Sequence, residues 1–162
     1  MIVVEGEGLL VRKIRSGVVI DHIPPGRAFT MLKALGLLPP RGYRWRIAVV
    51  INAESSKLGR KDILKIEGYK PRQRDLEVLG IIAPGATFNV IEDYKVVEKV
   101  KLKLPEESQG VLRCPNPTCI TRKEREKAVS KMVLVSQDPP AYRCVYCGTT
   151  VMGDEIHDLI SP

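Results

Sequence analysis

Hydrophobic and polar positions alternate along much of the chain, and in two stretches the hydrophobic positions instead recur every three or four residues. The helical spacing predicts one helix over about 27–38 and a second that Pro71 opens at its first position. Pro39-Pro40 and Pro84-Gly85 end these helices. A polar loop is expected over 53–60. Alternation and β-branched residues predict strands over 9–14, 17–23, 43–52, 61–67, 86–91 and 96–104.

The order of these elements indicates the fold class. A strand, a helix, two strands, a helix and a strand follow one another, with one extra strand at each end. This order is typical of an α+β sandwich of the ferredoxin-like type, in which helices cover one face of an antiparallel sheet. Residues 105–110 (PEESQG) are the expected linker, so we predict a first domain over 1–104 and a second over 105–162.

Charge is distributed unevenly between these two parts. The chain has 162 residues, with 26 Lys and Arg against 19 Asp and Glu, which gives a formal net charge of +7. All of this excess lies in residues 1–102, whereas residues 103–162 hold eight charges of each sign. The basic first part favours an anionic partner such as a nucleotide, a nucleic acid or an acidic protein surface.

The sequence also disfavours a membrane or secreted protein. The longest apolar runs fall far short of the roughly 18 residues that a membrane span needs. The first ten residues carry Glu5 and Glu7 and have no basic segment, so no signal peptide is expected. We therefore expect a soluble, cytoplasmic protein.

All four cysteines lie in the neutral second part, in two close pairs. Cys114 and Cys119 have four residues between them, and Cys144 and Cys147 have two. Two tight turns that each present two thiolates are what a tetrahedral metal ion requires. The spacing therefore predicts a small zinc-ribbon or rubredoxin-like β module with one structural zinc ion per chain, although iron would fit four sulfurs as well. The module is too short to rely on a hydrophobic core.

Two disulfides or a redox-active pair at Cys144 and Cys147 are the alternative interpretations. A reducing cytosol disfavours disulfides, and a redox pair would leave Cys114 and Cys119 unexplained. Four thiolates leave no open position for water, so the predicted metal is structural and not catalytic. The two negative charges that remain on such a site also disfavour a ribbon that binds nucleic acid.

No set of residues in the sequence suggests an enzyme. Neither glycine-rich phosphate-binding motif, G-x-x-x-x-G-K-[ST] or G-x-G-x-x-G, is present. The two histidines, His22 and His157, belong to no assignable catalytic triad or dyad, and we expect His157 to be a solvated surface residue.

Three segments of the basic part nevertheless contain unusual residues. Asp21 and His22 stand in an apolar strand, and alternation places them on opposite faces of it. Lys61 and Lys65 share one face of another strand. Asn89 is a poor strand former within a β-rich run, so a hydrogen bond explains its position better than packing does. Each feature alone also fits an ordinary strand end or a solvated face.

Taken together, five segments resemble one family. VIDHIP, GRKDILKIEG, the stretch from APGATFN to IEDYKVVEK, CPNPTCIT and CVYCG look like parts of the regulatory chain of aspartate carbamoyltransferase. They occur in order between about Leu9 and Cys147, which is nearly the whole chain. The combination is highly specific, although no single segment would be.

The resemblance implies a non-catalytic subunit that controls the first committed step of pyrimidine biosynthesis. Its N-terminal domain would bind nucleoside triphosphates (ATP, CTP or UTP), and its zinc domain would contact the catalytic chain. In the family, regulatory dimers bridge catalytic trimers. The implied partners are therefore a second copy of this chain and the catalytic trimer.

The resemblance also carries over site residues. Lys65 and Lys99, with Lys61 alongside, would supply positive charge to a triphosphate. The Asp21 carboxylate would accept hydrogen bonds from ribose hydroxyls, and apolar side chains would wall the base. The implied zinc ligands are Cys114, Cys119, Cys144 and Cys147. The implied nucleotide-binding residues are Ile14, Val19, Asp21, His22, Lys61, Lys65, Asn89, Ile91, Tyr94, Val96 and Lys99.

The competing hypothesis is a zinc-ribbon protein that binds nucleic acid. Such a protein would follow the phosphate backbone with the basic first part, and its affinity would fall steeply with salt. Only 5% of the residues are aromatic, which disfavours this function because single-strand binders stack bases on aromatic rings.

Overall fold

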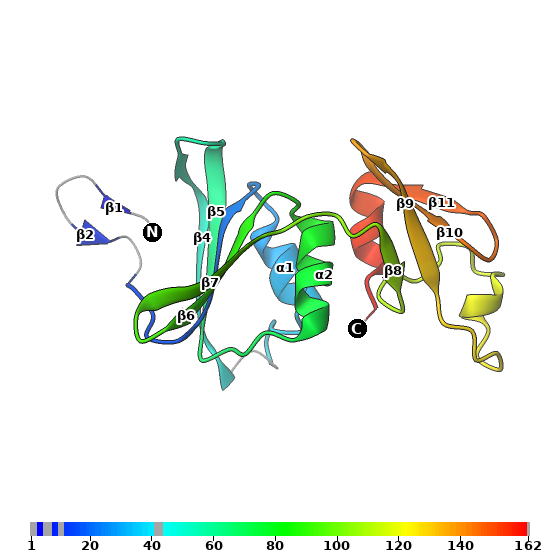
Figure 1. Cartoon of the computed structure of the whole chain (residues 1–162), viewed down its shortest axis with the longest axis horizontal. Helices are drawn as coiled ribbons and strands as arrows, with labels where there is room; N and C mark the ends of the chain where they lie inside the picture. The colour runs from blue at the N-terminus through cyan, green and yellow to red at the C-terminus, as the bar shows by residue number, and fades with distance from the viewer. Residues whose placement is uncertain (1–2, 5–7, 10–11, 41–43, 162) are drawn as a thin grey trace.

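The computed structural model describes residues 3–4, 8–9, 12–40 and 44–161. Figure 1 shows a larger body with two helices and, beside it, a smaller body made mainly of strands. A short hairpin of β1 (Val3–Val4) and β2 (Gly8–Leu9) precedes both. The predicted strand over 9–14 is wrong beyond Leu9, because residues 12–14 belong to no strand; residues 10 and 11 lie outside the described part.

The larger body is the predicted ferredoxin-like sandwich. All neighbouring strands of its five-stranded sheet are antiparallel, and Figure 1 shows both helices on the side of the sheet that faces the smaller body. The two helices are α1 (Ala28–Ala34) and α2 (Gln73–Ile82). Across the sheet the strands run in the order β4 (Arg46–Ser55), β5 (Gly59–Glu67), β3 (Gly17–Ile23), β6 (Thr87–Glu92) and β7 (Lys95–Lys101).

Several boundaries differ from the prediction for local reasons. Helix α1 ends at Ala34 and not near residue 38, since Gly36 adopts a left-handed φ of 73°. The N-cap of α2 is Arg72, so Pro71 precedes the helix instead of opening it. Strand β4 extends into the predicted polar loop, and its register shifts near Asn52, whose φ is 60°.

The smaller body is a four-stranded antiparallel sheet with two short 3-10 helices, η2 (Ile120–Arg122) and η3 (Gly153–Leu159). The predicted linker is partly wrong, because Glu107–Gln109 within it forms an edge strand of this sheet. We call this body the metal module. Its strands run in the order β11 (Thr150–Met152), β10 (Pro140–Cys144), β9 (Lys131–Gln137) and β8 (Glu107–Gln109).

A fully buried carboxylate, that of Asp62 on β5, connects three elements of the larger body. Its Oδ2 accepts the backbone N–H groups of Gly26, at 2.9 Å, and Ala28, at 3.3 Å, at the start of α1. Its Oδ1 accepts the N–H of Asn52, at 2.9 Å, where β4 is bulged. These bonds compensate the cost of burying the carboxylate, so its position determines where α1 and the bulge lie.

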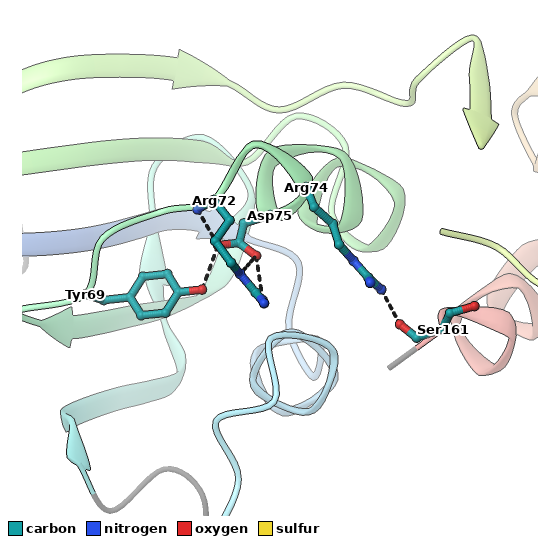
Figure 2. Close-up of polar contacts among 5 residues, drawn as sticks. All are labelled: Tyr69, Arg72, Arg74, Asp75 and Ser161. Carbon is teal, nitrogen blue, oxygen red and sulfur yellow. Dashed lines mark hydrogen bonds and ion pairs between the residues drawn. The ribbon is translucent and has the colours of Figure 1, made fainter. Parts of the chain in front are cut away.

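Helix α2 lies between the sheet and the metal module, and polar contacts hold its first turn (Figure 2). Asp75 accepts the Tyr69 hydroxyl at 2.6 Å and the backbone N–H of Arg72 at 2.8 Å. Burial and this carboxylate raise the pKa of Tyr69 to about 12, so the phenol remains a donor. On the same turn, the Arg74 guanidinium donates to the backbone carbonyl of Ser161 in the metal module.

The end of α2 packs against the chain that leads to the metal module. A Cβ built on Gly80 would lie 2.3 Å from the carbonyl oxygen of Lys103. Further along, Tyr142 of β10 donates its hydroxyl to the carbonyl of Pro105 at 2.7 Å. The connection between the two bodies is therefore packed from both sides.

Gly80→Ala should destabilise the chain, although Gly to Ala inside a helix usually stabilises by about 0.5–1 kcal/mol. The added methyl group would meet backbone that cannot rotate away, and overpacking of this kind costs about 1–3 kcal/mol. Thermal unfolding measures the difference, with Gln73→Ala at the exposed start of α2 as the control. A Gly80→Ala chain as stable as the wild type would contradict the close packing.

Candidate ligand cavity and metal centre

The face of the large sheet opposite the helices carries a row of four side chains, three of them polar. Strand register places Val19 of β3 beside Lys65 on one side and Asn89 on the other, and Asn89 beside Lys99 of β7. The intervening residues, such as Val18, Leu64 and Phe88, point to the helices and form the core. Four strands thus contribute one side chain each to the same row.

A cavity of about 330 Å³, which we call the sheet cavity, lies over this row. It brings together ten of the eleven residues predicted for the nucleotide site, and the remaining one, Lys61, contacts Asp21. Lys13, Ile63 and Thr87 also line it and were absent from the prediction. The predicted residues that line it are Ile14, Val19, Asp21, His22, Lys65, Asn89, Ile91, Tyr94, Val96 and Lys99.

Asp21 and Lys61 form an ion pair at the edge of the sheet cavity. Nζ of Lys61 lies 2.9 Å from Oδ1 of Asp21, and both side chains are nearly buried. Burial by itself would raise the pKa of Asp21, but the hydrogen bond and charge of Lys61 and the N–H of His22 together lower it. The carboxylate therefore stays ionised near neutral pH and can accept hydrogen bonds from a ligand.

The prediction that Asp21 and His22 point to opposite faces of the strand is wrong, because both residues line the sheet cavity. The backbone of His22 has a φ of 58°, and the register between β3 and β5 shifts at this point. The left-handed residue interrupts the alternation and turns the imidazole toward Thr87, with Nδ1 3.3 Å from Oγ1. Burial is the largest cause that lowers the pKa of His22, so the ring is neutral at pH 7.

Lys65 and Asn89, which both line the sheet cavity, form further polar contacts there. Burial lowers the pKa of Lys65, and the positive charge of the nearby Lys13 lowers it further. The negative charge of Asp21 acts in the opposite direction. Nζ of Lys65 donates to the backbone carbonyl of Arg12 at 3.1 Å. Asn89 forms the predicted hydrogen bond, from Nδ2 to the carbonyl of Val19 at 3.2 Å. Ammonium groups beside apolar walls suit a ligand with both an anionic and an apolar part.

The metal module brings the four cysteine sulfurs together. The Sγ atoms of Cys114, Cys119, Cys144 and Cys147 all lie within 4.8 Å of one another. Cys114 and Cys147 are 3.4 Å apart, and Cys119 and Cys144 are 3.8 Å apart. These separations exceed a disulfide bond and match the roughly 3.8 Å between thiolates at 2.3 Å from a tetrahedral zinc ion. The cluster therefore fits a structural zinc.

Neighbouring hydroxyl groups favour the thiolate form that a metal ion needs at two of the four cysteines, Cys119 and Cys147. Hydrogen bonds from the side chain and backbone of Thr149 lower the pKa of Cys147 to about 6. Burial disfavours the thiolate of Cys119, but hydrogen bonds from Thr121, together with those to Cys144 and Cys114, outweigh it and lower its pKa. Three of the four cysteines are buried, so the site is closed and holds the module together instead of activating water.

The fold and its two sites define a two-part protein, in which an α+β sandwich with an open cavity is joined to a metal-binding β module. No helix within the described parts of the chain is long and apolar enough to cross a membrane. Comparison with family models matches residues 9–103 to the allosteric domain of the aspartate carbamoyltransferase regulatory chain. Residues 106–157 match the metal binding domain of the same regulatory chain.

Curated relatives agree over almost the full length. The chain is 49% identical over 156 residues to the aspartate carbamoyltransferase regulatory chain of Hyperthermus butylicus, which covers 96% of both chains. It is 51% identical over 149 residues to that of Metallosphaera sedula, with 92% of both chains covered. For Methanopyrus kandleri the identity is 46% over 154 residues, covering 95% of this chain and 97% of the relative. The chain belongs to the family of aspartate carbamoyltransferase regulatory chains.

Cys144→Ser should abolish stoichiometric zinc binding and unfold the metal module, because the remaining three thiolates cannot close the tetrahedron and a module of this size depends on its metal for stability. We expect the zinc content, measured by metal analysis, to fall from one ion per chain to well below one. The near-ultraviolet circular dichroism of Tyr142 should be lost as well. Ser136→Ala on β9 is the control. A Cys144→Ser chain that retains a full zinc ion would contradict the four-cysteine site.

Proposed function

We propose that this chain is the non-catalytic regulatory subunit of an aspartate carbamoyltransferase and that it binds nucleoside triphosphates in the sheet cavity. The observation that carries the proposal is the row of Lys65, Val19, Asn89 and Lys99 across four strands, within a chain of this family. Binding of an effector at this row would bias the assembled enzyme between two states of different activity.

The chemistry of the sheet cavity supports a nucleotide. Lys65 and Lys99, with Lys13 beside them, supply positive charge for a triphosphate, and the ionised Asp21 can accept the ribose hydroxyls. Lys61 holds that carboxylate in place and takes a positioning role here. The base would lie against apolar side chains, and the backbone groups of these residues would form hydrogen bonds with its edge. The proposed walls are Ile14, Val19, Ile91, Tyr94 and Val96.

The domain division completes the proposal. Residues 1–104 would form the allosteric domain and residues 105–162 the zinc domain that contacts the catalytic trimer. A regulatory dimer would form through the large sheet. Among the residues that the structure describes, no strand pairs with the outer edge of β4 or of β7, so each edge is open to the same strand of a second copy. The cytoplasm is the proposed location, since its reducing conditions keep thiolates available for metal.

Lys99→Ala should weaken binding of CTP by about tenfold, because it removes one charge-assisted contact to a phosphate. Lys95→Ala is the matched control, since Lys95 is an exposed lysine of the same strand that does not line the sheet cavity. Calorimetry on the zinc-loaded chain measures both affinities. Equal affinity of the two variants for CTP would overturn the assignment of the nucleotide site to the sheet cavity. Salt-dependent binding to random duplex DNA that is stronger than binding to CTP would favour the nucleic-acid hypothesis.

The zinc-loaded chain should co-elute with the matching catalytic chain as a large complex. Removal of zinc with a thiol reagent should dissociate that complex, because the proposed contact surface belongs to the metal module. Sizing chromatography with light scattering gives the mass before and after removal. Absence of a complex in the zinc-loaded state would refute the partner, whatever the result of nucleotide binding.

A further inference from the structure

Two adjacent residues of β5 face different parts of the molecule. Lys61 contacts Asp21, which lines the sheet cavity, whereas Asp62 points to the opposite face of the sheet and is fully buried. Side chains at consecutive positions of a strand share one backbone and point in opposite directions. A displacement of β5 at the sheet cavity therefore also moves the Asp62 carboxylate.

The Asp62 carboxylate holds the chain on both sides of Arg27. It accepts the backbone N–H groups of Gly26 and Ala28, and Arg27 between them is the N-cap residue of α1. Buried hydrogen bonds to a carboxylate are costly to break without replacement. The start of α1 consequently follows Asp62 when β5 moves.

Arg27 then reaches two elements beyond its own helix. Its Nη1 donates to the carbonyl of Ile82, the last residue of α2, at 2.7 Å. Its Nη2 lies 3.4 Å from Oδ1 of Asp154 on η3, in the metal module. The prediction that His157 is a solvated surface residue is wrong, because this residue of the same 3-10 helix is half-buried. Figure 1 shows α1 and α2 between the large sheet and this module.

We propose that Arg27 is a positioning residue that transmits occupancy of the sheet cavity to the metal module, through Asp62 on one side and Asp154 on the other. The inference rests on the proposed function, because it requires a nucleotide in the sheet cavity. A ligand that draws Asp21 away from Lys61 displaces β5, and Asp62 carries the start of α1 with it. The Arg27 guanidinium then changes its contact with Asp154.

The contact between Arg27 and Asp154 is suited to switching. The Asp154 side chain is 84% exposed and that of Arg27 is 34% exposed, so water can replace either partner. Exposed ion pairs of this kind contribute little to stability. Loss of the contact should therefore alter communication between the two parts of the chain and leave folding unchanged.

Asp154→Asn in the assembled enzyme tests this route. We expect the ratio of activities with and without saturating CTP to move toward one, a loss of about twofold to tenfold in coupling. Calorimetric affinity for CTP and the thermal midpoint should stay at their wild-type values. Glu155→Gln is the matched control, because it removes the same charge from the next exposed residue of η3. That variant should respond to CTP as the wild type does.

A double-variant cycle completes the experiment. If Arg27 acts through Asp154, then Arg27→Ala combined with Asp154→Asn should lose no more coupling than Arg27→Ala alone. An unchanged CTP response in Asp154→Asn, or an equal loss in Glu155→Gln, would overturn the role of Arg27. Failure of the wild-type assembly to bind CTP would instead overturn the proposed function itself.

Discussion

The larger body depends on one buried interaction, the acceptance of three backbone N–H groups by Asp62. A carboxylate in the core would cost several kcal/mol if these donors were absent, so strand β5, the start of α1 and the bulge of β4 cannot shift independently. This constraint places an ion pair on one face of β5 and the helix start on the other. The sheet cavity and the side of the body that meets the metal module are therefore parts of one rigid arrangement.

Much of this arrangement could be predicted from local sequence patterns. Alternation identified β3 over Gly17–Ile23 with its full bounds, and apolar spacing located both helices. Two of the misses occur where a non-glycine residue adopts a left-handed backbone, at His22 and Asn52. Such positions are stabilised by partners distant in sequence, here Thr87 and Asp62, which no local pattern reveals. The strand in the expected linker was missed for the same reason, because its partner lies on β9.

The two sites differ in how much the sequence reveals of them. The cysteine cluster depends on two tight turns, so spacing along the chain was sufficient to predict which sulfurs meet. The sheet cavity is assembled across four strands, and its residues were proposed from the family resemblance instead of from spacing. Ile63 and Thr87, which also line it, become apparent only once strand register is known. Lys61 contributes to the sheet cavity only indirectly, because it contacts Asp21. This contact, between β5 and β3, likewise becomes apparent only from the pairing of the strands.

The connection between the two bodies has a consequence for how such chains can diverge. Residues 104–106 separate the Lys103 carbonyl, which packs on Gly80, from the first residue of β8. Within them, the carbonyl of Pro105 accepts the Tyr142 hydroxyl and that of Glu106 accepts the N–H of Leu134. Across the junction, Arg27 and Arg74 of the larger body contact Asp154 and Ser161 of the metal module. An exchange of modules between relatives by recombination at this point would separate these contacting residues. The two modules are consequently inherited best as a pair, and variation at the junction on one side requires matching change on the other.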